Sequence, residues 1–239
     1  MRTSFTAPVD IVITVVAMPR HDLPPDRHEP PWPAAAAILA ALLLFLSLPE
    51  KLTLGPNWVV PTLEGVLIVP LVLTRPHRGL VQSRQRRRLA IFLTGLLSAA
   101  NAASLALLVH SLLNPNSTGA VQGRPLVLAA IVIWLTNVAV FALWFWELDA
   151  GGPSARAGQT PRRPPDFLFP QMSAPEWAPQ GWRPTFVDYL FTSFTNASAF
   201  SPTDTMPLSR WAKTLMMLQA AASIVTVVLV ASRAVNILK

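Results

Sequence analysis

The sequence predicts an all-α integral membrane protein with five transmembrane helices and one re-entrant half-helix. Apolar residues make up 52% of the 239 residues and charged residues only 13%, which is the balance of a membrane protein. Five apolar segments approach or reach the length of the hydrocarbon core of a bilayer. A sixth, amphipathic segment near the end of the chain is shorter and is followed by prolines, so we expect it to enter the membrane without crossing it.

The composition also excludes several classes of site. The chain has no cysteine, which excludes disulfides, thiolate metal sites and cysteine nucleophiles. No two histidines have the spacing of a helical metal site, so no metal is expected. Without a nucleotide-binding loop or a nucleophile paired with a base, we expect neither an enzyme nor a cofactor. The formal charge of +7 is concentrated in one loop between apolar segments, which indicates contact with the lipid bilayer and not with nucleic acid.

The first part of the chain predicts a tail and a helical bundle. Residues 1–32 contain six prolines and no sustained periodicity, which predicts a flexible N-terminal tail. Residues 33–148 predict a four-helix transmembrane bundle, in which Asn101 and Asn137 are expected to hydrogen-bond between helices. The loop 75–88 between the second and third helices holds six arginines and no acid. The four expected helices cover residues 33–48, 59–74, 89–113 and 126–148.

Glu64 is the one carboxylate inside the second apolar segment. A charge at this depth costs about 2.5–3.5 kcal/mol on insertion scales, so the carboxyl group must be neutral, paired or in contact with water. Two interpretations follow. Either Glu64 takes part in a proton or ion relay, or it is a neutral acid hydrogen-bonded inside the bundle.

Residues 149–184 form a proline-rich loop with eight prolines and four arginines. A connection of this length without secondary structure is uncommon in a compact domain. The sequence leaves two alternatives, a disordered linker and an ordered cap. In the ordered cap, four aromatic side chains would hold the loop against the helices: Phe167, Phe169, Trp177 and Trp182.

Residues 185–239 predict a pore-like half-helix, a polar turn and the final transmembrane helix. Thr185 and Asp188 have the spacing of a capping box, and Pro202 lies where the helix must end. At about 14 residues the half-helix would rise about 21 Å, short of the roughly 30 Å hydrocarbon core. Its polar face consists of Asp188, Thr192, Thr195 and Asn196. The final helix carries a polar line for which a pore-facing stripe and helix packing are alternatives: Gln219, Ser223 and Thr226.

The segment SFTNASAFSPTDTMP, residues 193–207, aligns without a gap with the potassium-channel consensus SFxTLTTVGYGDxxP, and Phe194, Asp204 and Pro207 match it. A second set of motifs is Gly151–Gly152, Phe169–Pro170, Asp188–Thr195 and Ala234–Ile237. Through these motifs the chain resembles, over residues 33–238, a bacterial family of multi-pass membrane proteins described only as a domain of unknown function. This resemblance implies an architecture and a location in the bacterial plasma membrane, but no established activity.

The resemblance to potassium channels does not extend to their selectivity filter. Ser201 and Thr203 stand where the filter has glycines, and Pro202 stands where it has tyrosine. These residues oppose the backbone angles of a carbonyl cage. We therefore expect a wider, cation-preferring mouth without potassium selectivity, in a homo-oligomer that is a tetramer by analogy. Its filter-like residues are Ser198, Ser201, Pro202, Thr203, Asp204 and Thr205.

Two other functions are alternatives to a channel. The first alternative is a non-conducting integral membrane component, in which the polar turn only caps the half-helix. A small transporter of unknown substrate is the third alternative. The absence of an internal repeat in the sequence weighs against the commonest transporter architectures.

Positive charge predicts the orientation in the membrane. The tail, the 75–88 loop and residues 149–213 hold 15 of the 19 basic residues. Because cytoplasmic segments carry an excess of Lys and Arg, these segments and the N-terminus are expected in the cytoplasm. The half-helix then enters from the cytoplasmic side, and the C-terminus lies outside.

Overall fold

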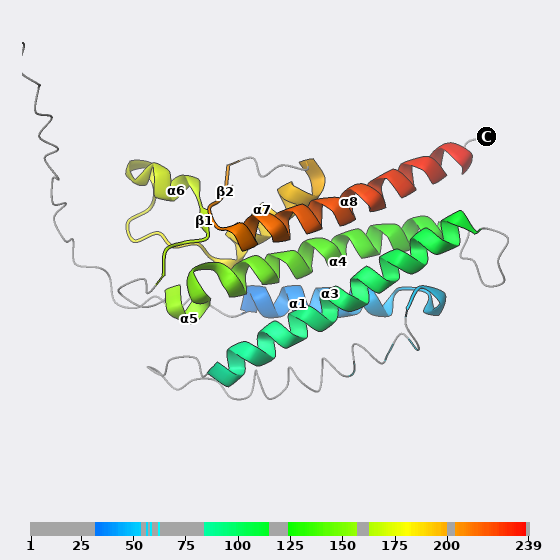
Figure 1. Ribbon diagram of the computed structural model, residues 1–239, viewed down its shortest axis with the longest axis horizontal. Coiled ribbons are helices and arrows are strands. Elements are labelled where there is room, and N and C mark those ends of the chain that lie inside the picture. The colour runs from blue at the N-terminus through cyan, green and yellow to red at the C-terminus, as the bar shows by residue number, and fades with distance from the viewer. Residues whose placement is uncertain are drawn as a thin grey trace, which may run out of the picture.

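The computed structural model describes residues 32–53, 84–114, 124–156, 163–199 and 204–237, together with the single positions 56, 58 and 62. The expected second helix with Glu64 lies outside the described residues, as do most of the N-terminal tail and three filter-like residues, Ser201, Pro202 and Thr203. The long helices are α1 (Trp32–Leu46), α3 (Arg84–Leu113), α4 (Arg124–Leu148), α7 (Phe186–Ala199) and α8 (Arg210–Ile237) (Figure 1). The short elements are α5 (Pro153–Arg156), α6 (Pro170–Ser173), the strands β1 (Phe167–Leu168) and β2 (Met206–Pro207), and 3₁₀ turns at Glu50–Leu52, Asp149–Gly151 and Pro175–Trp177.

Three of the described helices are long and apolar enough to cross a membrane. The candidate spans are Arg87–Leu113, Arg124–Gly151 and Arg210–Ser232, with 27, 28 and 23 residues. At about 1.5 Å per residue, even the shortest exceeds the roughly 30 Å hydrocarbon core. α1 is also apolar, but its 15 residues are fewer than a span needs. The described residues therefore form an all-α membrane-type architecture with three of the five expected spans.

α3 begins at Arg84 and not at Leu89, where the sequence predicted it. Arg and Gln are good helix formers, so the helix continues into the end of the arginine-rich loop. Arg87 and Arg88 therefore lie on the first turns of α3. The start of α3 lies at the same end of the bundle as the start of α8, since Arg87 and Trp211 line one cavity. We call this end of the bundle, which lies on the left in Figure 1, the basic end.

α4 is the central helix, because α1, α3, α7 and α8 all pack against it (Figure 1). The apolar window of α4 is 61% buried, against 33% for α3 and 22% for α8. A helix that is apolar on all sides is expected in the interior of a bundle. The remaining helices each keep one face that no described residue covers.

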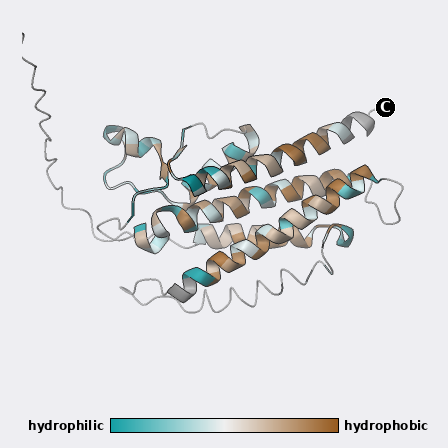
Figure 2. Ribbon diagram, in the orientation of Figure 1, coloured by the Kyte–Doolittle hydropathy of each residue, from teal (hydrophilic) through white to brown (hydrophobic). Residues whose placement is uncertain are grey.

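α3 and α8 contain long apolar stretches, which are brown in Figure 2, and they keep large apolar side chains exposed. On α8, large apolar side chains stay exposed at Met217, Leu218 and Val228, which retain 64%, 56% and 58% of their surface. A soluble monomer rarely exposes so continuous an apolar surface, whereas a bilayer solvates it. These faces are therefore suited to contact with lipid.

The described part of the proline-rich loop packs as an ordered cap on the basic end. Phe167 is fully buried and Phe169 is 3% exposed, and both pack with Phe145 of α4 and Tyr189 of α7. β1 pairs with β2 in an antiparallel ladder, which joins this loop to the segment that leads into α8. Trp177 differs from the expectation, because its side chain is 85% exposed.

α7 forms half of a hairpin that starts and ends at the basic end. It starts where Phe186 meets Trp146 near the end of α4, with ring centroids 5.9 Å apart. The helix α7 itself ends beside the middle of α4, where Trp134 Nε1 donates to the Ala197 carbonyl at 3.4 Å. By β2 the chain has returned to the basic end, because β2 pairs with β1 of the cap. The 14 residues of α7 therefore reach about 21 Å along α4.

Candidate functional site

The start of α7 is fixed by the two residues that predicted a capping box. The Asp188 carboxylate accepts the backbone N–H of Thr185 at 2.7 Å and the Thr185 hydroxyl at 2.8 Å, both at Oδ2. The acid therefore satisfies the free amide at the helix start, as in the expected motif. The threonine hydroxyl bonds to the acid and not to a backbone amide. Asp188 is thus engaged at the cap of α7.

The polar face of α7 points into the bundle, toward α4 and α8. The Ser193 hydroxyl donates to the Val138 carbonyl of α4 at 2.7 Å. The Gln219 side-chain amide of α8 donates to the Ser193 carbonyl at 2.9 Å and to its hydroxyl oxygen at 2.6 Å. Asn196 Nδ2 donates to Gln219 Oε1 at 2.8 Å and to the Met216 carbonyl at 3.0 Å. Both N–H donors and the Oε1 of Gln219 are therefore hydrogen-bonded within one chain.

The same polar network continues along α8 toward the other end of the bundle. Asn137 Nδ2 of α4 donates to Ser223 Oγ at 3.0 Å and to the Gln219 carbonyl at 3.3 Å, as expected for an interhelical asparagine. The Thr226 hydroxyl donates to the Ala222 carbonyl of its own helix at 2.8 Å. Gln219 and Ser223 are fully buried and Thr226 is 3% exposed. Of the two alternatives for this polar line, the contacts match helix packing.

The opposite face of α7 is apolar and uncovered. Val187, Phe191 and Phe194 keep 59%, 54% and 48% of their surface exposed. α7 therefore exposes large apolar side chains on its outer side, which is unusual for a helix on a water-soluble protein. Its buried side is mixed, because Phe186 and Tyr189 lie there with the polar Ser193 and Asn196. Apolar outer faces and hydrogen-bonded inner faces are the arrangement expected of helices in lipid.

The filter-like residues that the structure describes do not gather at one point. The Ser198 side chain is exposed and donates to the Phe194 carbonyl at 2.7 Å. Thr205 is buried, and its hydroxyl is hydrogen-bonded to that of Thr192 at 3.2 Å. Ser198 follows Thr192 by six residues, or about 9 Å along the helix axis, so it lies well away from Thr205. Asp204 is exposed.

The last member of the expected pore-helix face, Thr195, is partly exposed. Its hydroxyl bonds to carbonyls of its own helix, that of Phe191 at 2.9 Å and that of Thr192 at 3.1 Å. Thr195 and Ser198 therefore satisfy their hydroxyls locally. Neither makes a side-chain bond to α4 or α8 among the described contacts.

A pair of aspartates that no motif singled out joins the cap to three helices at the basic end. Asp149 is fully buried and accepts three bonds: Asp166 N at 2.6 Å, Phe167 N at 3.3 Å and the Tyr189 hydroxyl at 2.5 Å. Asp166 accepts Ala150 N at 3.0 Å and Trp211 Nε1 at 2.8 Å. The two carboxylates thus connect the end of α4 with the cap, α7 and α8. Since their oxygens are in use, the pair is structural.

The backbone after Asp149 needs the two glycines of the sequence motif. Ala150, Gly151 and Gly152 have positive φ angles of 51°, 91° and 99°. A Cβ atom on Gly152 would lie 2.9 Å from the Glu147 carbonyl oxygen, which is too close. The sharp turn lets the chain double back onto the end of α4. Only glycine adopts this backbone there without strain.

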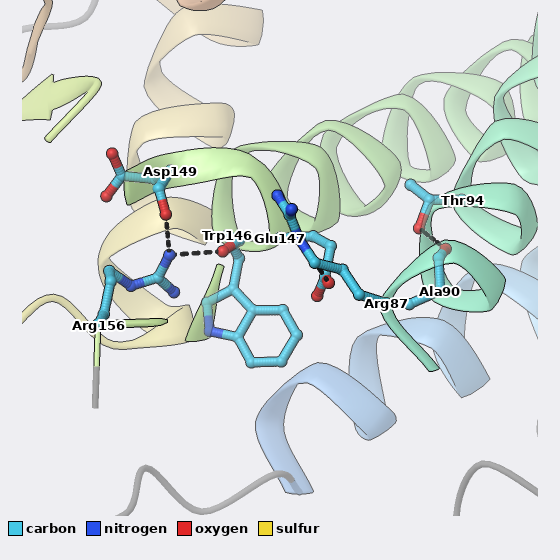
Figure 3. A network of polar contacts seen from close by, with 7 residues as sticks. All are labelled: Arg87, Ala90, Thr94, Trp146, Glu147, Asp149 and Arg156. Atoms are coloured by element: carbon cyan, nitrogen blue, oxygen red, sulfur yellow. Dashed lines mark hydrogen bonds and ion pairs between the residues drawn. The ribbon is translucent and has the colours of Figure 1, made fainter. Parts of the chain in front are cut away.

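Arg156 of α5 closes the end of α4 (Figure 3). Its Nη1 donates to the carbonyls of Trp146 and Asp149 at 2.8 and 2.7 Å. Both carbonyls lie at the C-terminal end of α4, where a cation complements the helix dipole. The guanidinium carbon lies 4.9 Å from the centre of the Tyr189 ring. Arg156 therefore fixes the turn from α4 into the cap.

Arg87 of the arginine-rich segment reaches toward α4 (Figure 3). Its Nε lies 3.9 Å from Glu147 Oε1, which makes a long ion pair. Glu147 is 4% exposed and Arg87 keeps 31% of its side chain exposed. Neither Nε nor Oε1 has a hydrogen-bond partner among the described residues. The pair therefore leaves hydrogen-bonding capacity unused.

The described residues contain no group of three or more His, Asp or Glu side chains placed to hold a metal ion. The arrangement is therefore one of buried hydrogen bonds between helices and a basic end. No protein-family model, curated protein or solved structure matches this chain.

Proposed function

We propose that this chain is a non-conducting integral membrane protein in which the pore-loop-like hairpin is a packing element of the bundle. One observation carries this proposal. The inner polar side chains of α7 and α8, which a channel would turn toward water, are buried and hydrogen-bonded within a single chain. Gln219 is fully buried, both of its N–H donors bond to Ser193, and its Oε1 accepts from Asn196.

In this proposal α7 is a re-entrant half-helix that enters a bacterial plasma membrane from the cytoplasm. Its length of about 21 Å is less than the roughly 30 Å core. Its outer residues Val187, Phe191 and Phe194 face lipid. Its buried polar residues Ser193 and Asn196 bond to α4 and α8. Among the described residues, the basic end carries Arg87, Arg88, Arg156, Arg163 and Lys213 of the expected cytoplasmic segments, which supports this orientation.

A cation-conducting homo-oligomer is the second candidate, and one observation favours it. Ser198 and Asp204 are both exposed on the outside of the chain, where a neighbouring copy would face them. In that assembly the apolar outer face of α7 would form the contact between subunits. Its cation preference would come from a ring of Asp204 carboxylates.

A flux measurement on purified protein in liposomes tests the two proposals. For the non-conducting protein we expect potassium and sodium flux equal to that of empty liposomes at all protein densities. Flux that rises with protein density and falls in the Asp204→Asn variant would overturn this proposal and support the oligomeric pore. Asp188→Asn, at the cap of α7 and away from the turn, is the matched control for the loss of one carboxylate.

A further inference from the structure

A cavity of about 540 Å³ opens at the basic end, and no residue of α7 lines it. It lies between the start of α3, the end of α4, the cap and the start of α8. Its polar lining comes from Arg87, Arg163, Asp166 and Thr214. Leu148, Leu215 and Trp211 form an apolar wall. The size is in the usual range of about 300–1,000 Å³ for small-molecule sites.

The polar lining favours an anion. Arg87 makes one long ion pair, and its Nε has no hydrogen-bond partner among the described residues. Arg163 is exposed and forms no ion pair within the described part of the chain. Asp166 is the acid in the cavity lining, and its two carboxylate oxygens already accept hydrogen bonds from Ala150 N and Trp211 Nε1. Two guanidinium groups with unused donors are suited to a phosphate group, which Arg binds as a bidentate fork.

The apolar wall connects this anion site with the lipid-facing surface. Leu215 and Trp211 are on the first turns of α8, and exposed Met217 and Leu218 follow on the same helix. A tryptophan at such a position is typical of the membrane–water interface. A molecule with a phosphate head and apolar chains could therefore place its head in the cavity and its chains along α8.

We propose that this cavity binds the head group of an anionic phospholipid, with the lipid phosphate between Arg87 and Arg163 and the acyl chains beside Leu215. Basic pockets between transmembrane helices on the cytoplasmic side are suited to such head groups. The inference requires only that the basic end lies at the membrane surface. It holds whether or not the protein conducts ions.

The test is lipid binding by the full chain in detergent, measured by native mass spectrometry. Phosphatidylglycerol and phosphatidylcholine with the same acyl chains are titrated separately. We expect one tightly bound phosphatidylglycerol and weaker binding of phosphatidylcholine. Arg163→Gln should weaken phosphatidylglycerol binding about fivefold, the factor that corresponds to about 1 kcal/mol per arginine at an anionic surface.

Arg88→Gln is the matched control, because Arg88 is exposed on the same turn of α3 but does not line the cavity. It should bind phosphatidylglycerol like the wild type. Equal weakening by both substitutions would overturn the site, since it would show attraction by the general charge of this end. Arg87→Lys is the second variant, because it keeps a cation beside Glu147 and loses the fork. Unchanged binding in Arg87→Lys and Arg163→Gln would likewise overturn the assignment.

Inorganic phosphate distinguishes the two sources of a phosphate group. If the site is built for lipid, millimolar phosphate leaves phosphatidylglycerol binding unchanged, because the apolar wall contributes to the affinity of the lipid. Displacement of the lipid by phosphate alone would overturn the lipid assignment in favour of a soluble anion.

Discussion

Replacing Gln219 by leucine tests whether the inner face of α8 is packed or faces a pore. The change keeps the side chain close to its size and removes three hydrogen bonds: two from Nε2 to Ser193 and one from Asn196 to Oε1. Interhelical hydrogen bonds in membrane proteins average about 0.6 kcal/mol each. The packed arrangement therefore predicts a loss of about 2 kcal/mol in the free energy of unfolding.

The assay is reversible unfolding in mixed detergent micelles, followed by circular dichroism. Met217→Leu is the control, because Met217 is 64% exposed on the outer face of the same helix and should change stability little. Combining Gln219→Leu with Ser193→Ala in a double-mutant cycle should give a coupling of about 0.6 kcal/mol. Unchanged stability in Gln219→Leu, or zero coupling, would refute the packed network, because a residue facing a water-filled pore makes no such bonds.

Two further substitutions probe the turn after α4 and the joint between α4 and α7. Gly152→Ala should lower the free energy of unfolding by at least about 1 kcal/mol, because its Cβ would meet the Glu147 carbonyl at positive φ. Gly95→Ala is the control, because Gly95 lies inside a helix and its Cβ would only reach ordinary contact with Trp144. It should raise the free energy of unfolding by up to about 1 kcal/mol in the same assay. Tyr189→Phe removes the hydrogen bond from the tyrosine hydroxyl to Asp149 and should lower the free energy of unfolding by about 1–3 kcal/mol. An unchanged melting temperature would contradict that bond.

The half-helix was predictable because its signals are local. Thr185 and Asp188 mark its start, and the observed helix runs from Phe186 to Ala199, close to the expected 14 residues. The long spans were predictable for the same reason, since length and apolar composition define them. The first turn of α3 was missed because arginines were assigned to a loop by charge, whereas their helix propensity is high.

The direction of the polar face of α7 was not predictable. Thr192 and Asn196 have the same spacing whether they face water or another helix, and only the neighbours decide. The neighbours of Asn196 are Met216 and Gln219, which come from a helix twenty or more residues later. The aspartate pair was missed for a similar reason. Asp149 meets its partners only after the cap has folded back, and no spacing rule connects them.

The inward polar face of α7 has a consequence for the order of membrane insertion. α4 and α7 leave the ribosome before α8, so Asn196 has no Gln219 to bond while the hairpin is being made. A polar face without partners is unfavourable in hydrocarbon, so in the membrane arrangement proposed above we expect α7 to stay at the surface until α8 has inserted beside α4. The half-helix would then be the last element to enter the bundle. A chain that stops before Arg210 lacks Gln219, and we expect it to leave α7 at the membrane surface.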